Sequence, residues 1–562
     1  MHHHLTLRSK LIIMISVMAS LFLVALDQTI IATALGKIVE DFNAFSSLSW
    51  IVTAYLITTT MTVPIAGKLS DLFGRRTILL IGVAVFVAGS LLSGLSGNIT
   101  ELIAWRALQG IGGGIITANA FTIVGDLFAA RERGRWQGLI GAVFGLSSVI
   151  GPLLGGWLTD GAHFFGLTTD WRWTFFINVP VGIVAFILIA IYCPALRHAT
   201  KVKIDYWGAA LLSIATAVLI LAVDNTETIF ADVMTSTGLT LVWLRVIMFA
   251  VVAAAIAGFI YVERKADEPI LPLRFFKNRN FVTVLAIATF FGAAFMGSIL
   301  YLTQFNQQVF GATPTQSGLM LLPMVAGIMI SSIGSGQIIS RTGRYKIFMQ
   351  IGFLVATASM VALTFLTPET PYLYEAVVMT ILGLGMGVAM PVLNLAIQNE
   401  VEQKDLGVAT SSSQLFRSLG STIGTAVFGA MLTAGIVSQV AAMKNTEYIK
   451  SLGQSSQVSA IGNLDDANTL LTLNTPDIKQ KITDAADAQF SKLPDAYATK
   501  AREQFNTNQQ EFASIVTHAF SDSLQRIFIV ASSLVGFSAV MVFTLKERTL
   551  RSAKPDATPG EA

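Results

Sequence analysis

Long apolar segments are the feature that most constrains this chain of 562 residues. A helix needs roughly 20 mainly apolar residues to cross the hydrocarbon core of a bilayer. Only 13% of the residues are charged, against about 25% in an average soluble domain. The sequence therefore predicts an all-α membrane protein with fourteen spans. We place them near residues 11–35, 47–67, 77–97, 101–123, 134–158, 173–194, 206–223, 240–262, 280–305, 314–339, 346–367, 372–396, 407–437 and 524–545.

The distribution of Lys and Arg predicts the orientation of these spans. Basic residues are retained on the cytoplasmic side of short loops. With the N-terminus inside, the cytoplasmic segments hold 24 Lys and Arg, whereas the short outer loops hold only Lys37 and Arg172. We therefore expect a multi-pass protein of the cytoplasmic membrane with both termini in the cytoplasm.

The sequence repeats itself after about 270 residues. The segment Gly67–Arg76 is a charged turn between two apolar runs, and Gly336–Arg344 repeats its glycine spacing and its Gly-Arg ending. The same shift pairs Gly110, Gly112 and Gly114 with Gly383, Gly385 and Gly387. Parallel repeats of six spans characterise one large class of transporters. The predicted domains are a six-helix half at 1–200, two inserted spans at 201–270, a second six-helix half at 271–548 and a cytoplasmic tail at 549–562.

The second half also contains a polar stretch at about 440–520 that the topology places outside the membrane. Within it, Asp477–Phe490 is compatible with a surface helix, and Gly453–Ser459 with a flexible segment. We interpret the stretch as an exposed loop. A lid or a partner-binding element is the alternative.

The charged turn itself combines residues suited to a conformational latch: Gly67, Asp71, Gly74, Arg75 and Arg76. Gly67 and Gly74 permit the tight backbone that joins two helices. Asp71 is expected to meet a helix N-terminus, whose dipole favours an anion, or to pair with an arginine. The second copy has Ser340 in place of the acid, so such a latch would be asymmetric. A plain positive-inside anchor is the alternative interpretation.

Two charged residues lie inside predicted spans. Asp27 is about 24 Å along the first helix if each residue rises 1.5 Å, and Arg106 lies in the fourth span. Charged groups in a membrane are costly and usually face a cavity or a partner. Asp27 is therefore a candidate for proton or cation recognition, and Arg106 for coupling protonation to substrate binding. A purely structural role for either residue stays open.

The fifth span carries closely spaced glycines and a proline, namely Gly145, Gly151, Pro152, Gly155 and Gly156. Pro152 bends a helix because it removes a backbone hydrogen bond. A bent helix with a smooth glycine face can rock against a neighbour, although ordinary close packing would use the same residues.

Other polar residues within spans are candidates for lining a substrate path: Gln28, Asn119, Gln304, Asn306, Asn394 and Gln414. The sequence lacks a GxxxxGK[ST] phosphate loop, an HExxH motif and a GxSxG motif. With one cysteine, Cys193, it also lacks a multi-cysteine metal site. We expect no enzyme activity, no metal, no cofactor and no nucleic-acid partner.

Five of these segments, in order, resemble the major facilitator superfamily, specifically its fourteen-span drug:proton antiporter branch (the EmrB/QacA-like proteins). Gly67–Arg76 resembles the loop between spans two and three, Arg106–Gly114 the fourth-span arginine motif, and Gly145–Gly156 the fifth-span antiporter motif. Leu26–Ile30 and Trp171–Pro180 resemble stretches typical of the fourteen-span branch. The chain departs from the branch at Ile31–Ala34, where relatives usually have an asparagine.

The resemblance implies proton-driven export of small amphipathic compounds by a monomer that uses alternating access. By the same resemblance, Asp27 would bind protons or cationic groups, Arg106 would couple protonation to conformation, and Asp71 with Arg75 would stabilise the outward-open form. A transporter with one narrow substrate, such as a metabolite, a siderophore or a single antibiotic, is the alternative. A further alternative is a membrane sensor or channel with the same fold.

Overall fold

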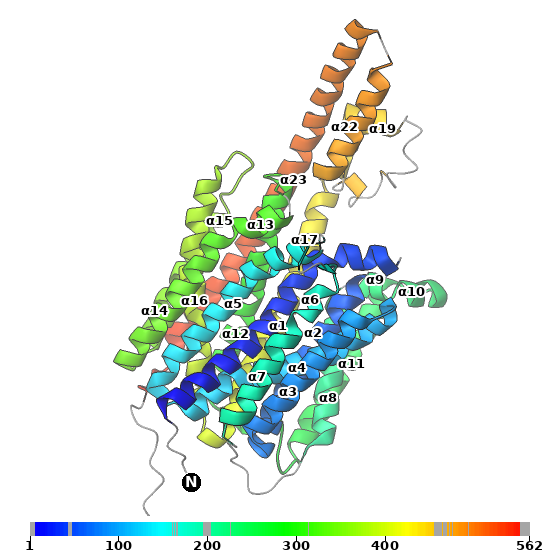
Figure 1. The fold of residues 1–562 in the computed structure, drawn as a ribbon. Coiled ribbons are helices and arrows are strands. Elements are labelled where there is room, and N and C mark those ends of the chain that lie inside the picture. The colour runs from blue at the N-terminus through cyan, green and yellow to red at the C-terminus, as the bar shows by residue number, and fades with distance from the viewer. Residues whose placement is uncertain are drawn as a thin grey trace, which may run out of the picture.

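The structure is a computed structural model of the whole chain. It describes all residues except 1–5, 43–47, 160, 162, 165–166, 195–203, 225, 313, 454–463, 465–468, 471–472, 475, 493 and 551–562. Within the described part, fourteen helical segments are long and apolar enough to cross a membrane, which confirms the predicted number of spans. They form one elongated helical bundle (Figure 1).

The first half contains six spans. They are α1 (Leu7–Phe42), α2 (Leu48–Phe73), α3 (Arg75–Leu95), α4 (Ile99–Leu127), α5 (Ala130–Thr159) and the pair α6 (Trp173–Phe176) and α7 (Asn178–Tyr192), which follow each other with a break at Ile177. Two short antiparallel strands, β1 (His163–Phe164) and β2 (Leu167–Thr168), pair in the connection between α5 and α6.

The inserted pair and its connections follow. The spans are α8 (Tyr206–Val223) and α11 (Leu241–Glu263), and the short helices α9 (Thr226–Ile229) and α10 (Ala231–Thr237) join them. α8 and α11 pack on each other, and α8 also contacts α2 and α17 (Leu406–Val437). The 3-10 helix η2 (Leu273–Lys277) then leads into the second half.

The second half has six further spans: α12 (Arg279–Gln308), α14 (Leu322–Thr342), α15 (Lys346–Leu363), α16 (Tyr372–Gln398), α17 and α23 (Asp495–Thr544). Shorter elements are α13 (Pro314–Met320), η3 (Gln403–Asp405), α18 (Val440–Lys444), α19 (Glu447–Gly453) and α22 (Pro476–Phe490). α16 packs on α14 and α15 just as α4 packs on α2 and α3. The glycine triplets found 273 residues apart in the sequence therefore occupy matching helices.

Polar side chains fix where several spans begin. Asn98 caps α4 by accepting a hydrogen bond from the Glu101 N–H, and Asp205 caps α8 in the same way from Gly208. Asn278 accepts from two backbone N–H groups at the start of α12. These side chains satisfy N–H groups that a helix leaves unpaired in its first turn.

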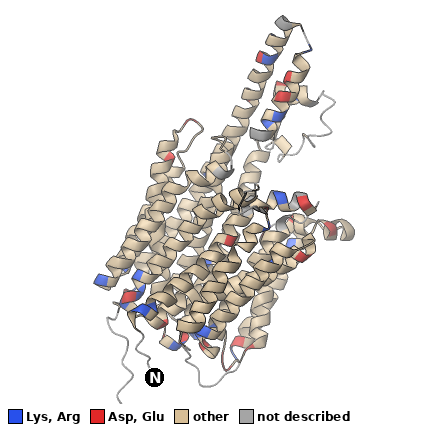
Figure 2. Ribbon diagram, viewed as in Figure 1, with Lys and Arg blue, Asp and Glu red and all other residues tan. Residues whose placement is uncertain are grey.

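Charges are distributed unevenly along the bundle. Figure 2 shows Lys and Arg gathered at the end where α1 begins and where α2 meets α3. We call this the basic end; by the charge rule it is the end predicted to face the cytoplasm. At the opposite end, α22 and the first part of α23 project beyond the other helices (Figure 1).

This projecting segment contains more helix than the exposed loop expected at 440–520, and α22 matches the surface helix expected at Asp477–Phe490. Four helices occupy much of it, and α23 is a continuous helix of 50 residues whose last part is the fourteenth span. At 1.5 Å per residue α23 is about 75 Å long, more than twice the hydrocarbon thickness. Tyr448 is fully buried there against the rings of Phe505 and Phe512. The flexible stretch expected at Gly453–Ser459 lies mainly outside the described residues.

Candidate functional site

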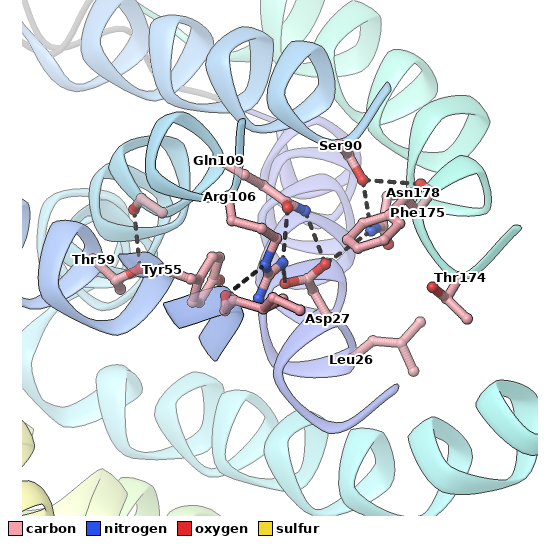
Figure 3. Close-up of polar contacts among 12 residues, drawn as sticks. Leu26, Asp27, Tyr55, Thr59, Ser90, Arg106, Gln109, Thr174, Phe175 and Asn178 are labelled. Carbon is pink, nitrogen blue, oxygen red and sulfur yellow. Dashed lines mark hydrogen bonds and ion pairs between the residues drawn. The ribbon is translucent and has the colours of Figure 1, made fainter. Parts of the chain in front are cut away.

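A buried ion pair joins the first and fourth spans. Asp27 of α1 has an exposed fraction of 0%, and Arg106 of α4 has 1%. Arg106 Nη1 donates to Asp27 Oδ2 at 2.5 Å (Figure 3). A carboxylate so deep in an apolar bundle is stable only when a cation or several donors compensate it. The two residues singled out in the sequence are therefore direct partners.

Two amide side chains, from α4 and α7, complete the coordination of Asp27. Gln109 Nε2 donates to Asp27 Oδ1 at 2.8 Å, and Gln109 Oε1 accepts from Arg106 Nη1, also at 2.8 Å. Asn178 Nδ2 lies 3.4 Å from Asp27 Oδ1 and 3.0 Å from Ser90 Oγ (Figure 3). The amide of Gln109 thus bridges both charges, so that acid and base are held as one unit.

Aromatic rings enclose the guanidinium. The Arg106 Cζ atom lies 4.3 Å from the centroid of the Tyr55 ring and 5.7 Å from that of Phe175. Arg106 Nε also donates to the carbonyl of Ile51 at 3.4 Å. Water is largely excluded at this depth, which strengthens the attraction between the charges. A proton or a cationic ligand that binds Asp27 must therefore compete with Arg106.

The charged turn holds a second buried network, at the basic end. Asp71 forms an ion pair with Arg75, and its two carboxylate oxygens accept from the backbone N–H groups of Gly407 at 3.3 Å and Val408 at 3.2 Å. Those N–H groups belong to the first turn of α17, where the helix dipole favours an anion. Asp71 thus connects the first half to the second.

Arg75 has a further anionic partner in α4. Its Nε donates to Asp126 Oδ2 at 2.7 Å, and Gln403 Nε2 lies 3.3 Å from the other oxygen of Asp126. Arg75 is fully buried. We call Asp71, Arg75 and Asp126 with the first turn of α17 the latch.

The other three residues expected in the latch are not part of this buried charge network. Gly74 is the turn itself, with φ of 96°, a conformation that favours glycine. Gly67 lies within α2 rather than in the turn, and a Cβ atom there would come 2.3 Å from Ser411 Oγ of α17. Gly67 therefore allows close contact between the halves. Arg76 donates to the carbonyl of Ala190 in α7, a contact within the first half.

The second copy of the turn makes a weaker contact between the halves. Arg131 Nε of α5 donates to the backbone carbonyl of Ser340 at 2.9 Å, and the Ser340 side chain is not the acceptor. Gly343 ends α14 with φ of 73°. The two copies thus differ in their chemistry, as the loss of the acid in the second copy predicts.

The glycine-rich α5 lies between α1 and α14. A Cβ atom on Gly151 would come 2.0 Å from Thr29 Oγ1 of α1, whereas one on Gly145 would come 3.4 Å from Val325 Cγ1 of α14. Nearer the basic end, a Cβ atom on Gly138 would come 2.2 Å from the carbonyl oxygen of Ser332 in α14. A Cβ atom on Gly318 of α13 would come 3.5 Å from Pro152 Cβ. Gly155 is buried and Gly156 is half-buried. The two halves therefore meet along a glycine-lined seam.

Additional hydrogen bonds close the basic end. Gln137 of α5 donates to Gln398 of α16 at 2.9 Å, and Gln398 donates to the Phe121 carbonyl of α4 at 3.2 Å. The connection after α11 adds a contact from the inserted pair, in which Lys68 Nζ lies 2.6 Å from Glu268 Oε2. Beside it, a cavity of about 690 Å³ is lined by Lys68, Glu263 and Asp405, among others.

The candidate path residues are mostly buried in this conformation. Asn119, Asn306, Asn394 and Gln414 are at most 2% exposed. Asn119 and Asn394 donate to carbonyls of their own helices. Gln304 is half-buried and Gln28 is exposed. Sequence reasoning did not identify Gln109, Asn178 and Asp126; the position of Gln109, three residues after Arg106 on one helix face, was the available signal.

The sole cysteine lies next to the sixth span. Cys193 is 2% exposed, and burial raises the pKa of its thiol to about 12. The group is therefore protonated at neutral pH and inaccessible to thiol reagents. Among the described residues no cluster of His, Cys, Asp and Glu is suited to hold a metal ion.

Comparison with known proteins gives consistent matches. The Major Facilitator Superfamily profile matches residues 17–425. The multidrug transporter protein MdtP of Bacillus subtilis is 36% identical over 542 residues, which cover 96% of this chain and 93% of that protein. Multidrug resistance protein 3 of the same organism is 32% identical and covers 96% and 97%. Among solved structures, the human organic anion transporter MFSD10 (TETRAN) has a TM-score of 0.54 at 14% identity, covering 75% of this chain and 93% of its own.

Proposed function

This chain belongs to the major facilitator superfamily, and from that premise we propose that it exports small amphipathic compounds in exchange for protons. Two relatives that match almost its whole length are named as multidrug proteins, which supports a broad range of substrates. Transporters of this superfamily are not enzymes, and a proton gradient across the cytoplasmic membrane would drive this one without a cofactor.

The observation that carries the proposal is the buried Asp27–Arg106 pair. A carboxylate held by one guanidinium and two amides can exchange partners, because a proton or a cationic group can replace the arginine. Asp27 would bind the cationic group of a compound from the cytoplasm. A proton from outside would then neutralise Asp27, weaken its hold on the compound and complete the exchange.

The latch would link this exchange to alternating access. It closes the basic end in the present structure, since Asp71 accepts from Gly407 and Val408 across the two halves. If the basic end faces the cytoplasm, as the Lys and Arg bias supports, this is the form closed to the cytoplasm. Opening would separate α17 from α2 and slide α14 along the glycine face of α5. Because α8 contacts both α2 and α17, it would lose one of these two contacts.

Transport in everted membrane vesicles tests the proposal. An imposed pH gradient is monitored with a fluorescent probe while cationic and neutral dyes are added one at a time. We expect cationic dyes to dissipate the gradient, D27N to abolish the effect, and D232N, which changes an exposed acid of α10, to leave it intact.

The dye panel also separates the alternatives. A response to several unrelated dyes supports multidrug export, and a response to a single compound supports a narrow transporter. If no compound moves protons, and D27N behaves as the wild type, the antiport proposal is wrong.

A further inference from the structure

A fully buried acid also lies in the second half of the bundle. Glu375 lies in the first turn of α16 and has an exposed fraction of 0%. Neither of its carboxylate oxygens makes a hydrogen bond with a described group. The side chain of Asn306, from the last turns of α12, is the polar group beside it. Asn306 is also fully buried, and both polar atoms of its amide lack a hydrogen-bond partner among the described residues.

Charged groups on the helices around Glu375 lie elsewhere. Those nearest the basic end are Arg279 of α12, Arg341 of α14, Lys346 of α15 and Arg131, Glu132, Arg133 and Arg135 of α5. Arg417, in the middle of α17, interacts with Gln414. At the opposite end, Glu369 of the preceding loop pairs with His518 of α23 at 3.2 Å, and both are exposed. The titratable neighbours on α16 itself are the phenols of Tyr372 and Tyr374, and that of Tyr374 donates to the Ala362 carbonyl at 2.9 Å.

Asp27 and Glu375 therefore lie in opposite electrostatic environments. Arg106 and Gln109 compensate the charge of Asp27, whereas the described residues supply no cation to Glu375. An isolated ionised carboxylate in an apolar interior is so costly that the group takes up a proton instead. The protonated acid is complementary to Asn306, because its O–H can donate to the amide oxygen while its carbonyl accepts from the amide N–H.

We propose that Glu375, beside Asn306, is a second proton-binding site of the transport cycle and is loaded from the end of the bundle opposite the basic end. Its position supports this direction of entry. Glu375 is three residues from the start of α16, or about 4.5 Å along the helix axis, and this start lies at the end opposite the basic end. The inference rests on the proposed exchange of protons for substrate, and it places a proton on Glu375 in the present conformation.

Infrared spectroscopy of the purified protein tests the protonation directly. The carbonyl stretch of a protonated carboxylic acid is separate from that of a carboxylate and shifts in D₂O. We expect this band at neutral pH in the wild type. In E375Q the band should lose the intensity of one carboxyl group, and in D27N it should not change. E369Q is the matched control and should leave the band unchanged. Hydrogen bonds from its own backbone and from Thr367 lower the pKa of Glu369 and keep this acid ionised. If D27N removes the band and E375Q keeps it, the proposal is overturned.

Transport in proteoliposomes gives a second, independent readout. We expect E375Q to reduce substrate accumulation driven by a pH gradient at least tenfold while exchange of internal for external substrate persists, because Gln resembles the protonated acid in shape and charge. E375D should recover part of the coupling. Full gradient-driven accumulation in E375Q would overturn the proposal. If E375Q loses both modes of transport, the infrared comparison decides. Absence of gradient-driven transport in the wild type would instead reject the proposed function.

Discussion

Replacement of Asp71 by Asn should open the basic end of the bundle. The side chain keeps its shape but loses its charge, so one of the two acceptors for the Gly407 and Val408 N–H groups disappears. Arg75 keeps an anionic partner, because Asp126 lies 2.7 Å from its Nε atom. The variant should therefore fold, and the loss should fall on the contact between the halves.

The size of the effect follows from these contacts. A hydrogen bond to a charged group contributes about 1.5–3 kcal/mol, and the attraction of a carboxylate to a helix N-terminus about 0.3–1 kcal/mol. Both N–H···O distances are at the long end of the usual range. We therefore expect a loss of about 2 kcal/mol, which shifts the equilibrium between closed and open forms about 30-fold.

Distances between spin labels can measure this shift. Labels at Glu132 and Arg344, which are exposed and belong to different halves at the basic end, would report a short distance in the closed form. The native thiol of Cys193 is buried and should stay unlabelled. D71N should increase the population with the longer distance.

The second copy of the turn supplies the matched control. S340A removes a side chain that does not take part in the Arg131 contact, because the backbone carbonyl is the acceptor. It should leave the distance distribution unchanged. An unchanged distribution in D71N would refute the assignment of Asp71 as the element that closes the basic end.

Three further predictions follow from the packing. G138A should also favour opening at the basic end, because the new methyl group would lie 2.2 Å from the Ser332 carbonyl oxygen. In G334A, on the neighbouring α14, the new methyl group would have no atom within 4 Å, so this variant should have no effect in the same label measurement. R106K should lower substrate-driven proton movement in vesicles at least tenfold. A single ammonium cannot replace the guanidinium contacts to Asp27, Gln109 and Ile51, each a hydrogen bond of about 1.5–3 kcal/mol. Proton movement at the wild-type rate in R106K would contradict this prediction. Y448A should destabilise the projecting helices by about 3–5 kcal/mol and speed their proteolysis without loss of transport, whereas Y497A, at a site that is 71% exposed, should resist proteolysis as the wild type does.

The sequence predicts the spans well because the signal for a span is local. A run of about 20 apolar residues must cross the bilayer whatever its neighbours are. The continuous 50-residue α23 shows the limit of this rule. Its outer part is polar and is helical because it packs against α19 and α22. This part of the sequence contains no continuous apolar run that would indicate such packing.

The partners of the buried charges are harder to predict. Asp27 and Asn178 are 151 residues apart, and Arg75 and Asp126 are 51 apart. Only the tertiary arrangement decides which polar side chains meet. Glu375 illustrates the difficulty, because an acid near the end of an apolar run is equally compatible with an exposed interface position. Its burial depends on the packing of α16 against α12, α14 and α15.

Matching helices of the two repeats connect each buried acid to the closed basic end. α4 carries Arg106, the partner of Asp27, and Asp126, the partner of Arg75 in the latch. These two residues are 20 positions apart, about 30 Å along a helix. A tilt of α4 that frees Arg106 from Asp27 would therefore also strain the Arg75–Asp126 pair.

α16 repeats this arrangement with different chemistry. It carries Glu375 near one end and Gln398, which bonds to α4 and α5, at the other. The 23 positions between them span about 35 Å. At the basic end, α4 is held by a buried ion pair and α16 by hydrogen bonds between neutral amide groups. The contact between the halves should therefore open first along α16. Loss of the proton from Glu375 would create an uncompensated charge on that weaker side, and the cost of burying it favours a conformation that exposes the acid. A neutral E375Q side chain removes this drive, so its coupling defect should be a failure to return the empty carrier rather than a failure to bind substrate.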